Sequence, residues 1–375
     1  MRLGRRRAAV LAAVLIAAAL GLSGRAADLV LAGRMLLAVR TLAAGSPASE
    51  QGVERVSVHR PWGERSLEAV LYRPSSARPE RAVVLVAGVS ELGCFHPRLV
   101  ALAHALARMG FAVLTPDIAM FRRYEVAPGA LEELAFWTRA APSLAEAPAV
   151  RQVGIIGISF SGTLAVMTAA RPELRDSVRF VLAIGPYDDL AGVARGWFAP
   201  GPITVEPGRY PTRAYGKWIV MLQALDALPE PHDRAVLDAS LRSLLAGRTL
   251  PPAAGLGTEG GRWLRLAVGR ETESDPELAR AIEAHLARYY ARMSPAQAAA
   301  EVRCPVFLAH GAFDDLIPSD ESRRLAERLP GRARLLVSPL LTHTHPLDRP
   351  LGWRDRLGAA AGMAPFFYAL ARAAR

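Results

Sequence analysis

The chain contains almost no lysine, although it is strongly basic. Its formal net charge is +11, and nearly all of its basic residues are arginine, with Lys217 the only lysine. The arginines are scattered along the sequence, without the basic stripe and interleaved aromatic residues that are typical of nucleic-acid binding. The composition therefore predicts no nucleic-acid partner. With 375 residues and 51% hydrophobic residues, the chain can bury a large core, which excludes a disordered protein.

Cysteine is also scarce. Cys94 and Cys304 are too few for a disulfide framework, and no CxxC or histidine-rich ligand spacing accompanies them. One follows a predicted strand and the other precedes one, which places them at opposite edges of a parallel sheet. We expect two separate reduced thiols, no metal and no cofactor.

The N-terminus has the layout of a secretory signal or a signal anchor. Arg2, Arg5, Arg6 and Arg7 precede an uncharged apolar run from Ala8 to about Gly24. At about seventeen residues, the run is at the short limit for a bilayer span. We expect a membrane-anchored protein with its globular part outside the cytoplasm, or export to the periplasm or extracellular space if the segment is cleaved. Residues 26–44 are apolar but contain charges, which predicts an amphipathic surface helix.

Composition divides the chain into four stretches. Residues 1–45 comprise the predicted anchor or signal with the adjoining helix, and a small, polar, proline-containing linker follows at 44–51. We expect a core in two parts, residues 46–190 and 301–375, separated by an inserted helical cap at 191–300. No internal repeat is visible.

Short apolar strands alternate with helical stretches in both parts of the core. Residues 53–58 and 67–72 flank a turn and predict an antiparallel pair at the edge of a sheet. Continuous apolar runs, typical of strands buried on both faces, follow at 82–87, 111–114, 154–158, 180–184, 306–309 and 334–337. The alternation predicts an α/β fold with a doubly wound, mostly parallel sheet, which binds ligands at the carboxyl ends of its strands.

The alternation stops between Ala191 and Ala300. Proline- and glycine-rich segments separate predicted helices at 217–228, 233–246 and 276–293. We expect the last of these helices to begin with a capping box formed by Ser274 and Glu277.

A serine follows the strand predicted at residues 154–158, in the sequence Gly157-Ile158-Ser159-Phe160-Ser161-Gly162. Small residues two positions before and after Ser159 allow the strained strand-to-helix turn that projects a nucleophile. The usual glycine after the nucleophile is here Ser161. A dinucleotide-binding loop is the competing motif, but its third glycine is not at the required offset.

A serine hydroxyl needs a base and an orienting carboxylate, and both occur downstream. Asp314 lies in an acidic loop after the strand predicted at residues 306–309. His343 and His345 follow the last predicted strand, and either residue could be the base. An HxH pair can also bind a metal, but no third ligand lies at a suitable spacing.

Together these motifs resemble the α/β-hydrolase superfamily, over residues 81–189 and from Met293 to the C-terminus, in the order serine, acid, histidine. The family's spacing from His310 to its acid and on to Pro318 implies Asp314 as the acid. Its spacing after the proline that ends the last strand, here Pro339, implies His343 as the base, with His345 in reserve.

The resemblance also implies an oxyanion hole. Its donors are the backbone N–H groups of Phe160, after the nucleophile, and of Val89, in the loop after the strand at 82–87. The family's histidine before the glycine of that loop is here Ala87. The same loop contains Glu91, Cys94 and His96, which we interpret as ordinary loop residues.

The expected function is therefore hydrolysis of a small carboxylic ester through an acyl-enzyme, as in the dienelactone-hydrolase-like or acyl-peptidase-like branches. Two alternatives remain at this point: an acyltransferase with a hydroxyl acceptor, and a catalytically silent, membrane-tethered binding protein. The sequence indicates neither the substrate nor the oligomeric state.

Overall fold

The computed structural model of the chain describes residues 24–43, 51–145, 150–198, 212–269, 275–341 and 352–375. The predicted signal or anchor lies almost wholly outside the described residues, and so do Ser274, His343 and His345. Among the helices of the described ranges, none combines the length and the hydropathy needed to cross a bilayer.

An eight-stranded sheet forms the centre of the molecule, in the order β1-β2-β4-β3-β5-β6-β7-β8. Its strands are β1 (Val53–Trp62), β2 (Arg65–Pro74), β3 (Arg81–Val86), β4 (Phe111–Pro116), β5 (Val153–Ile158), β6 (Val178–Ile184), β7 (Val306–Gly311) and β8 (Ala333–Ser338). β2 pairs antiparallel with β1 and with β4, and all other neighbours are parallel. The predicted edge pair and the mostly parallel sheet are confirmed. Strands β3 to β7 are buried almost throughout, which explains their continuous apolar runs.

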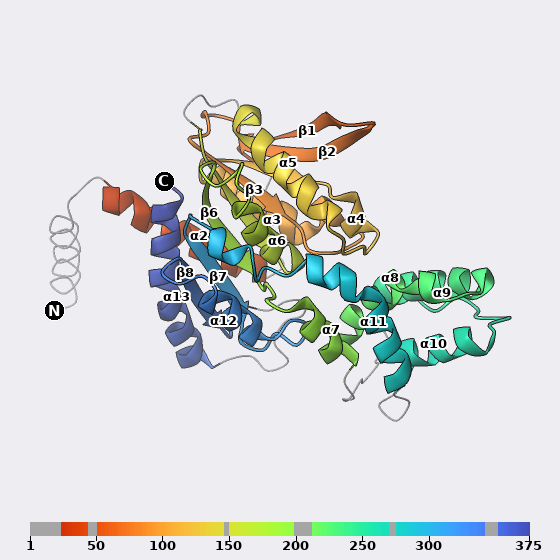
Figure 1. Ribbon diagram of the computed structural model, residues 1–375. Helices are drawn as coiled ribbons and strands as arrows, with labels where there is room; N and C mark the ends of the chain where they lie inside the picture. Colours follow the sequence, from red (N-terminus) through yellow and green to blue (C-terminus); the bar gives the residue numbers. More distant parts are fainter. Residues whose placement is uncertain (1–23, 44–50, 146–149, 199–211, 270–274, 342–351) are drawn as a thin grey trace.

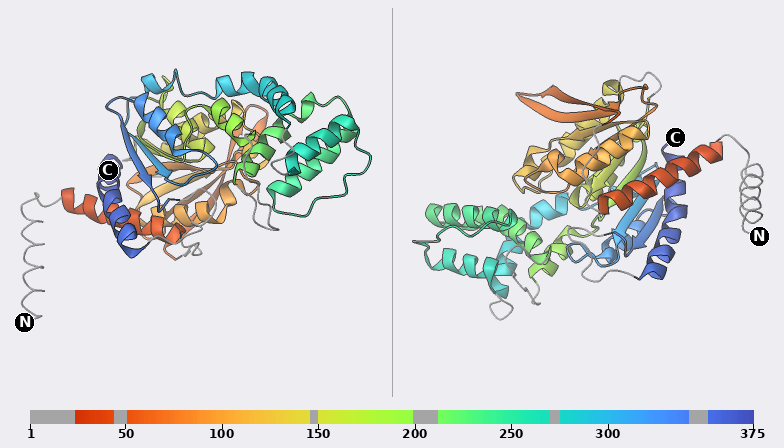
Figure 2. Two further views of the ribbon diagram at one scale, coloured as in Figure 1. Left: turned by 90° about the horizontal axis from the view of Figure 1, so that it is seen from below. Right: turned by 180° about the vertical axis from the view of Figure 1, so that it is seen from behind.

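Helices cover both faces of the sheet (Figure 2). One face packs against α2 (Gly24–Ala43), α3 (Pro97–Arg108) and α13 (Trp353–Ala373). The other packs against α5 (Gly129–Leu144), α6 (Phe160–Ala169) and α12 (Ser319–Glu327), with the short α4 (Ala119–Arg122) nearby. Cys94 and Cys304 are both free and buried, as expected, and burial raises the pKa of the Cys94 thiol to about 12.

Helix α2 packs on the core. The predicted helix is present, and Leu31, Ala32 and Met35 are buried against α3 and α13. Leu29 and Val30, by contrast, are 52% and 56% exposed. The predicted division at residue 45 groups α2 with the N-terminal segment, whereas in the structure α2 helps to cover the sheet.

The inserted cap is helical and projects from one end of the molecule (Figure 1). It comprises α7 (Leu190–Phe198), α8 (Thr212–Gln223), α9 (Pro231–Leu245), α10 (Thr258–Val268) and α11 (Pro276–Arg292). The capping box predicted with Ser274 is wrong, because the N-cap of α11 is Asp275, whose side chain accepts a hydrogen bond from the N–H of Leu278. Asp275 also pairs with Arg262 of α10, so one carboxylate both caps α11 and joins two cap helices.

The only lysine of the chain is buried inside this cap. Lys217 of α8 is 4% exposed, and its Nζ donates a hydrogen bond of 2.7 Å to the carbonyl of Leu266 in α10. Burial lowers the pKa of Lys217 to about 8, because the charged form has lost its hydration.

We expect replacement of Lys217 by methionine to stabilise the protein at neutral pH. In the unfolded chain the pKa of lysine is about 10.4, so between pH 8 and 10.4 the unfolded state binds more protons and stability rises with pH. Below pH 8 Lys217 is charged in the folded state, and the lost hydration of this buried charge lowers the free energy of unfolding. Lys217→Met removes this charge at the expense of one hydrogen bond, for a net gain of about 1–2 kcal/mol in the free energy of unfolding.

Denaturant titrations of both proteins at pH 7 and pH 10 test this. The advantage of the variant should shrink at the higher pH, since the native lysine is then neutral in the folded state. A variant that is less stable than the native protein at pH 7 would contradict the argument.

Candidate active site

Ser159 lies on a strained turn between β5 and α6. Its φ of 58° and ψ of −127° are found in few residues other than glycine, and it is the N-cap residue of α6. Gly157 makes the turn possible, because a Cβ there would lie 2.1 Å from the carbonyl oxygen of Ser161. Ser159 and Ile158 are partly exposed, whereas Gly157 before them and Phe160 after them are buried, so the turn presents the serine side chain at the carboxyl edge of the sheet.

Ser161 explains how the turn tolerates serine where glycine is usual. It is completely buried. Its Oγ accepts a hydrogen bond from the N–H of Ile158 at 3.0 Å and lies 2.9 Å from the carbonyl oxygen of Ile158 and 3.1 Å from that of Val86. The hydroxyl therefore braces the turn and joins it to the end of β3.

The loop after β3 lies against Ser159. A Cβ on Gly88 would be 3.3 Å from the Cβ of Ser159, so only glycine allows this approach without adjustment. Val89 follows directly. Of the other loop residues, Cys94 is buried in the core and His96 caps α3 by accepting a hydrogen bond from the N–H of Arg98. These two side chains have structural partners away from Ser159, as the interpretation as ordinary loop residues implies.

Asp314 lies after β7 and is held in one orientation. Its Oδ1 accepts hydrogen bonds from the N–H groups of Leu316 and Ile317 at 3.1 and 3.0 Å. Its side chain is only 2% exposed. A buried carboxylate that is stabilised by two backbone donors keeps a fixed position, which is what an orienting acid requires.

His310 lies near Asp314, with its Nε2 3.4 Å from Oδ2, but it is not available as a base. It is completely buried, its Nε2 lies 2.8 Å from the carbonyl oxygen of Ile317, and its Nδ1 lies 2.6 Å from the hydroxyl of Ser322. Because a carbonyl can only accept, Nε2 carries the proton and Nδ1 accepts from Ser322. His310 therefore supports the acidic loop.

The chain that leads to the predicted histidines passes beside Asp314. A Cβ on Gly311 would lie 2.5 Å from the carbonyl oxygen of Leu341 and 3.6 Å from the Cβ of Asp314. Leu341 is the last described residue before the range that contains His343 and His345. The loop after β8 thus approaches the acidic loop where glycine leaves room for it.

Backbone hydrogen bonds connect the serine and the acid across β6. The N–H of Ser159 donates to the carbonyl of Ile184, and the N–H of Gly185 donates to that of Ala309 in β7. A serine on a strand-to-helix turn and an acidic loop two strands away thus share one edge of a mostly parallel sheet. The chain has the α/β-hydrolase fold.

No protein-family model and no curated protein matches the chain. It is similar to a thermostable esterase from Pseudomonas putida (TM-score 0.46, 15% identity, 90% of this chain and 88% of the esterase). It is also similar to Est1E from Butyrivibrio proteoclasticus (TM-score 0.46, 16% identity, 85% of this chain and 99% of Est1E).

A further similarity is to the acylaminoacyl peptidase of Pyrococcus horikoshii, with a TM-score of 0.46 and 12% identity over 84% of this chain. The matched region is 40% of the peptidase, so the chain spans less than half of that protein. At these identities no substrate and no residue role transfers to this α/β-hydrolase fold.

Two aromatic side chains of the cap bind the two loops beside Ser159. Trp197 of α7 donates through Nε1 to the carbonyl of Leu316 at 2.6 Å, and the N–H of Leu316 in turn binds Asp314. Tyr215 of α8 donates its hydroxyl to the carbonyl of Val89 at 3.0 Å. Sequence reasoning missed both residues, because nothing in the pattern of the cap shows which of its aromatic residues reach the core.

We expect Tyr215→Phe to lower kcat and leave KM nearly unchanged. Burial raises the pKa of Tyr215 well above its ordinary value, so the phenol stays protonated and keeps donating to Val89. Removing that bond loosens the Val89–Ser90 peptide, and with it the backbone N–H of Val89. The resemblance to α/β-hydrolases implies that the N–H of Val89 is an oxyanion donor. Losing such a donor outright costs about 3 kcal/mol, so a loosened one should cost about 1–2 kcal/mol, or roughly tenfold in kcat.

Tyr290→Phe is the matched control, because Tyr290 is also buried in the cap and its hydroxyl has no partner among the described residues. Steady-state kinetics on a p-nitrophenyl ester compare the two variants. Equal losses in both, or a rise in KM alone for Tyr215→Phe, would mean that Tyr215 does not act through the loop that contains Val89.

Proposed function

We propose that the protein is a serine hydrolase that cleaves a small carboxylic ester through an acyl-enzyme. The observation that supports this most directly is the backbone of Ser159, a non-glycine residue with a φ of 58° at the start of a helix. Strain of this kind persists where the surrounding structure enforces it, and it is concentrated at functional sites. Here it presents a hydroxyl at the sheet edge where α/β folds bind ligands.

In the proposed reaction, the Oγ of Ser159 attacks the acyl carbonyl while His343 takes its proton. Asp314 orients the imidazole and stabilises its charged form. The alcohol leaves with the proton from His343, and water, activated by the same histidine, then releases the acid. His345 is the reserve candidate for the base.

The negative charge that develops on the carbonyl oxygen requires two donors, which we assign to the N–H groups of Phe160 and Val89. Phe160 is the first residue of α6, so its N–H has no acceptor within the helix and adds to the positive end of the helix dipole. Its ring stacks on Tyr187 and meets Phe121 edge to face. These contacts restrict movement of the peptide that carries the donor.

Incubation with a fluorophosphonate probe tests the proposal. Peptide mapping should find the label on Ser159, which is partly exposed, and not on Ser161, which is buried with its hydroxyl hydrogen-bonded. A folded sample that takes up no label would remove the hydrolase assignment.

We also propose that the first residues hold the protein at a membrane or direct its export. The arginines at positions 2, 5, 6 and 7 followed by an uncharged apolar run support this. Recovery of the protein in the cytosolic fraction of its cells would reject the proposal.

A further inference from the structure

Two adjoining cavities lie at the amino edge of the sheet, opposite the edge that carries Ser159. Their volumes are about 390 and 400 Å³, and they share Gln152, Asp176 and Arg179. Six arginines line them, which we call the arginine face: Arg81, Arg151, Arg175, Arg179, Arg303 and Arg375.

Three of the six arginines form no ion pair with a carboxylate of the described residues, although the carboxylate of Asp176 also lines both cavities. Arg175 pairs with Glu301, Arg375 with Asp28 and Arg81 with Glu80. Arg151, Arg179 and Arg303 are exposed and have no acidic partner within the described parts of the chain.

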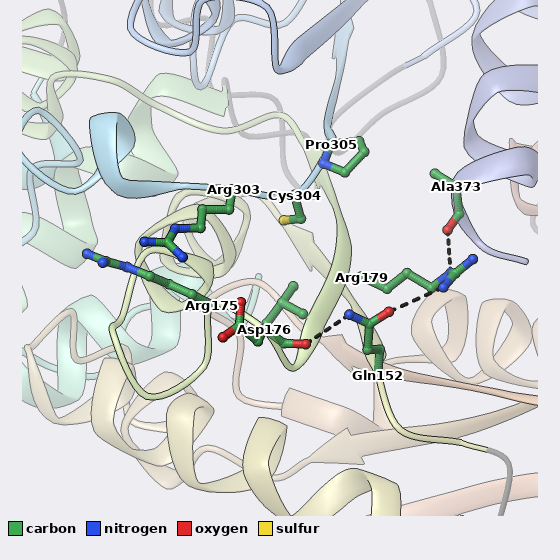
Figure 3. Close-up of a pocket in the computed structure, with 9 residues that line it drawn as sticks. Gln152, Arg175, Asp176, Arg179, Arg303, Cys304, Pro305 and Ala373 are labelled. Atoms are coloured by element: carbon green, nitrogen blue, oxygen red, sulfur yellow. Dashed lines mark hydrogen bonds between the residues drawn. The ribbon is translucent and has the colours of Figure 1, made fainter.

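Figure 3 shows that the guanidinium group of Arg179 is held by neutral groups instead. It donates to the carbonyl of Ala373 and to the side chain of Gln152. The pKa of Arg81 is lowered mainly by burial. Glu80 and Asp28 raise it, whereas the charges of Arg375 and Arg179 lower it. An anionic surface would offset this repulsion.

The fold gathers arginines that are scattered in the sequence. Arg81, Arg151, Arg179 and Arg303 each lie at or just before the start of a different strand, and parallel strands begin at one edge. Among the described residues that line the two cavities, the only aromatic one is Phe180, which is buried. Without exposed aromatic residues for stacking, the face is a poor match to single-stranded nucleic acid.

Exposed apolar residues adjoin the arginine face. The contact between Asp28 and Arg375 places the first turns of α2 beside it, at 3.0 Å. The next two residues, Leu29 and Val30, are more than half exposed. Apolar side chains next to unbalanced arginines are the combination found in elements that lie on a bilayer surface. Residues 1–23, with their arginines and apolar run, immediately precede this point in the chain.

We propose that the arginine face, with Leu29 and Val30 beside it, docks on a bilayer that contains anionic phospholipids. The guanidinium groups bind the lipid phosphates, and Ser159, at the opposite edge, faces away from the bilayer. The inference rests on the proposed membrane location of the N-terminal segment and is independent of the proposed ester hydrolysis.

The test uses the full chain and vesicles of phosphatidylcholine, with and without phosphatidylglycerol. The measured quantity is the ratio of the two vesicle affinities in a co-sedimentation assay. This ratio cancels the apolar contribution of the N-terminal segment, which is the same in all proteins compared. In the double variant Arg151→Gln, Arg303→Gln we expect the ratio to fall about 30-fold, because each of the two arginines near an anionic surface contributes on the order of 1 kcal/mol.

Arg280→Gln, Arg288→Gln is the matched control, since it removes the same charge from exposed positions of cap helix α11. The control should keep the native ratio, and added salt should reduce the ratio of the native chain. Equal ratios in the two variants, or no preference of the native chain for phosphatidylglycerol, would overturn the proposal. So would tight binding of a DNA duplex that is lost in the double variant while vesicle binding is unchanged.

Hydrolysis of a soluble ester and thermal unfolding are measured on the same samples. Arg151 and Arg303 are exposed and their side chains have no ionic partner among the described residues, so we expect both readouts to match the native protein. A protein that hydrolyses the ester but shows no lipid preference would reject docking alone. One that prefers anionic vesicles but does not hydrolyse esters would reject the catalytic proposal alone.

Discussion

Replacing Ser159 by alanine should reduce turnover of a p-nitrophenyl ester by roughly 10⁴–10⁶-fold, the range measured when a hydrolase loses its nucleophile. The expected loss is in kcat, because the hydroxyl forms its new bond only during the reaction. The residual rate would come from the oxyanion donors and from substrate binding. Kinetics with a range of enzyme concentrations measure this effect and expose any contaminating esterase.

The control for this variant is Ser161→Ala. Its hydroxyl bonds to the backbone of Ile158, at the start of the turn, and of Val86 in β3, so alanine should lower stability by about 1–3 kcal/mol and keep measurable turnover. If Ser161→Ala were inactive while Ser159→Ala kept most of its activity, the nucleophile would be assigned to the wrong serine. The buried position of Ser161 makes that outcome hard to explain chemically.

His343→Ala should lower kcat by about 10⁴-fold or more, whereas His345→Ala should keep most of the activity. A serine hydroxyl is almost wholly protonated at neutral pH, so without a base the attack has little driving force. The comparison is made on the same ester, with far-ultraviolet circular dichroism to establish that both variants fold.

The two histidines are only two residues apart, so the comparison decides between them. Inactivity of His345→Ala alone would move the base to His345. Full activity in both variants would remove the proposed triad, including the role assigned to Asp314.

The sheet could be predicted from the sequence because its strands are buried on both faces. A strand such as β3 has no polar position to interrupt it, and its apolar run is therefore visible without alignment. The turn at Ser159 was predictable for a related reason. Small residues are required where backbone approaches backbone, as at Gly157, and that requirement appears as a short pattern.

Other features depend on contacts between residues that are far apart in sequence. Tyr215 and Val89 are separated by 126 residues, and nothing local to either one indicates the hydrogen bond between them. The N-cap of α11 lies one residue later in the structure than the sequence predicted. Serine and aspartate are both favourable N-cap residues, so the local sequence does not distinguish Ser274 from Asp275. In the structure Asp275 is the N-cap, and its carboxylate also pairs with Arg262 on another helix.

The positions of the arginines in the sequence do not show how these residues are grouped in the folded protein. Beyond the N-terminal segment they are scattered along the chain, and the absence of a basic stripe argues against a nucleic-acid partner. In the fold, strand starts that are tens of residues apart become neighbours, and Arg151, Arg179 and Arg303 lie around the same two cavities. Charge patterning is therefore better evaluated after the order of the strands is known.

The hydrogen bonds of the Ser161 hydroxyl determine when the turn at Ser159 and the loop after β3 become aligned. That hydroxyl joins the turn that carries Ser159 to Val86, at the end of the strand that leads to Gly88 and Val89. It therefore holds the proposed nucleophile and this loop in register before substrate binds. The loss of conformational entropy needed to align them is then incurred once, when the chain folds, and is not repeated in each catalytic cycle. A glycine at this position would permit the same turn but would leave part of that ordering to the substrate.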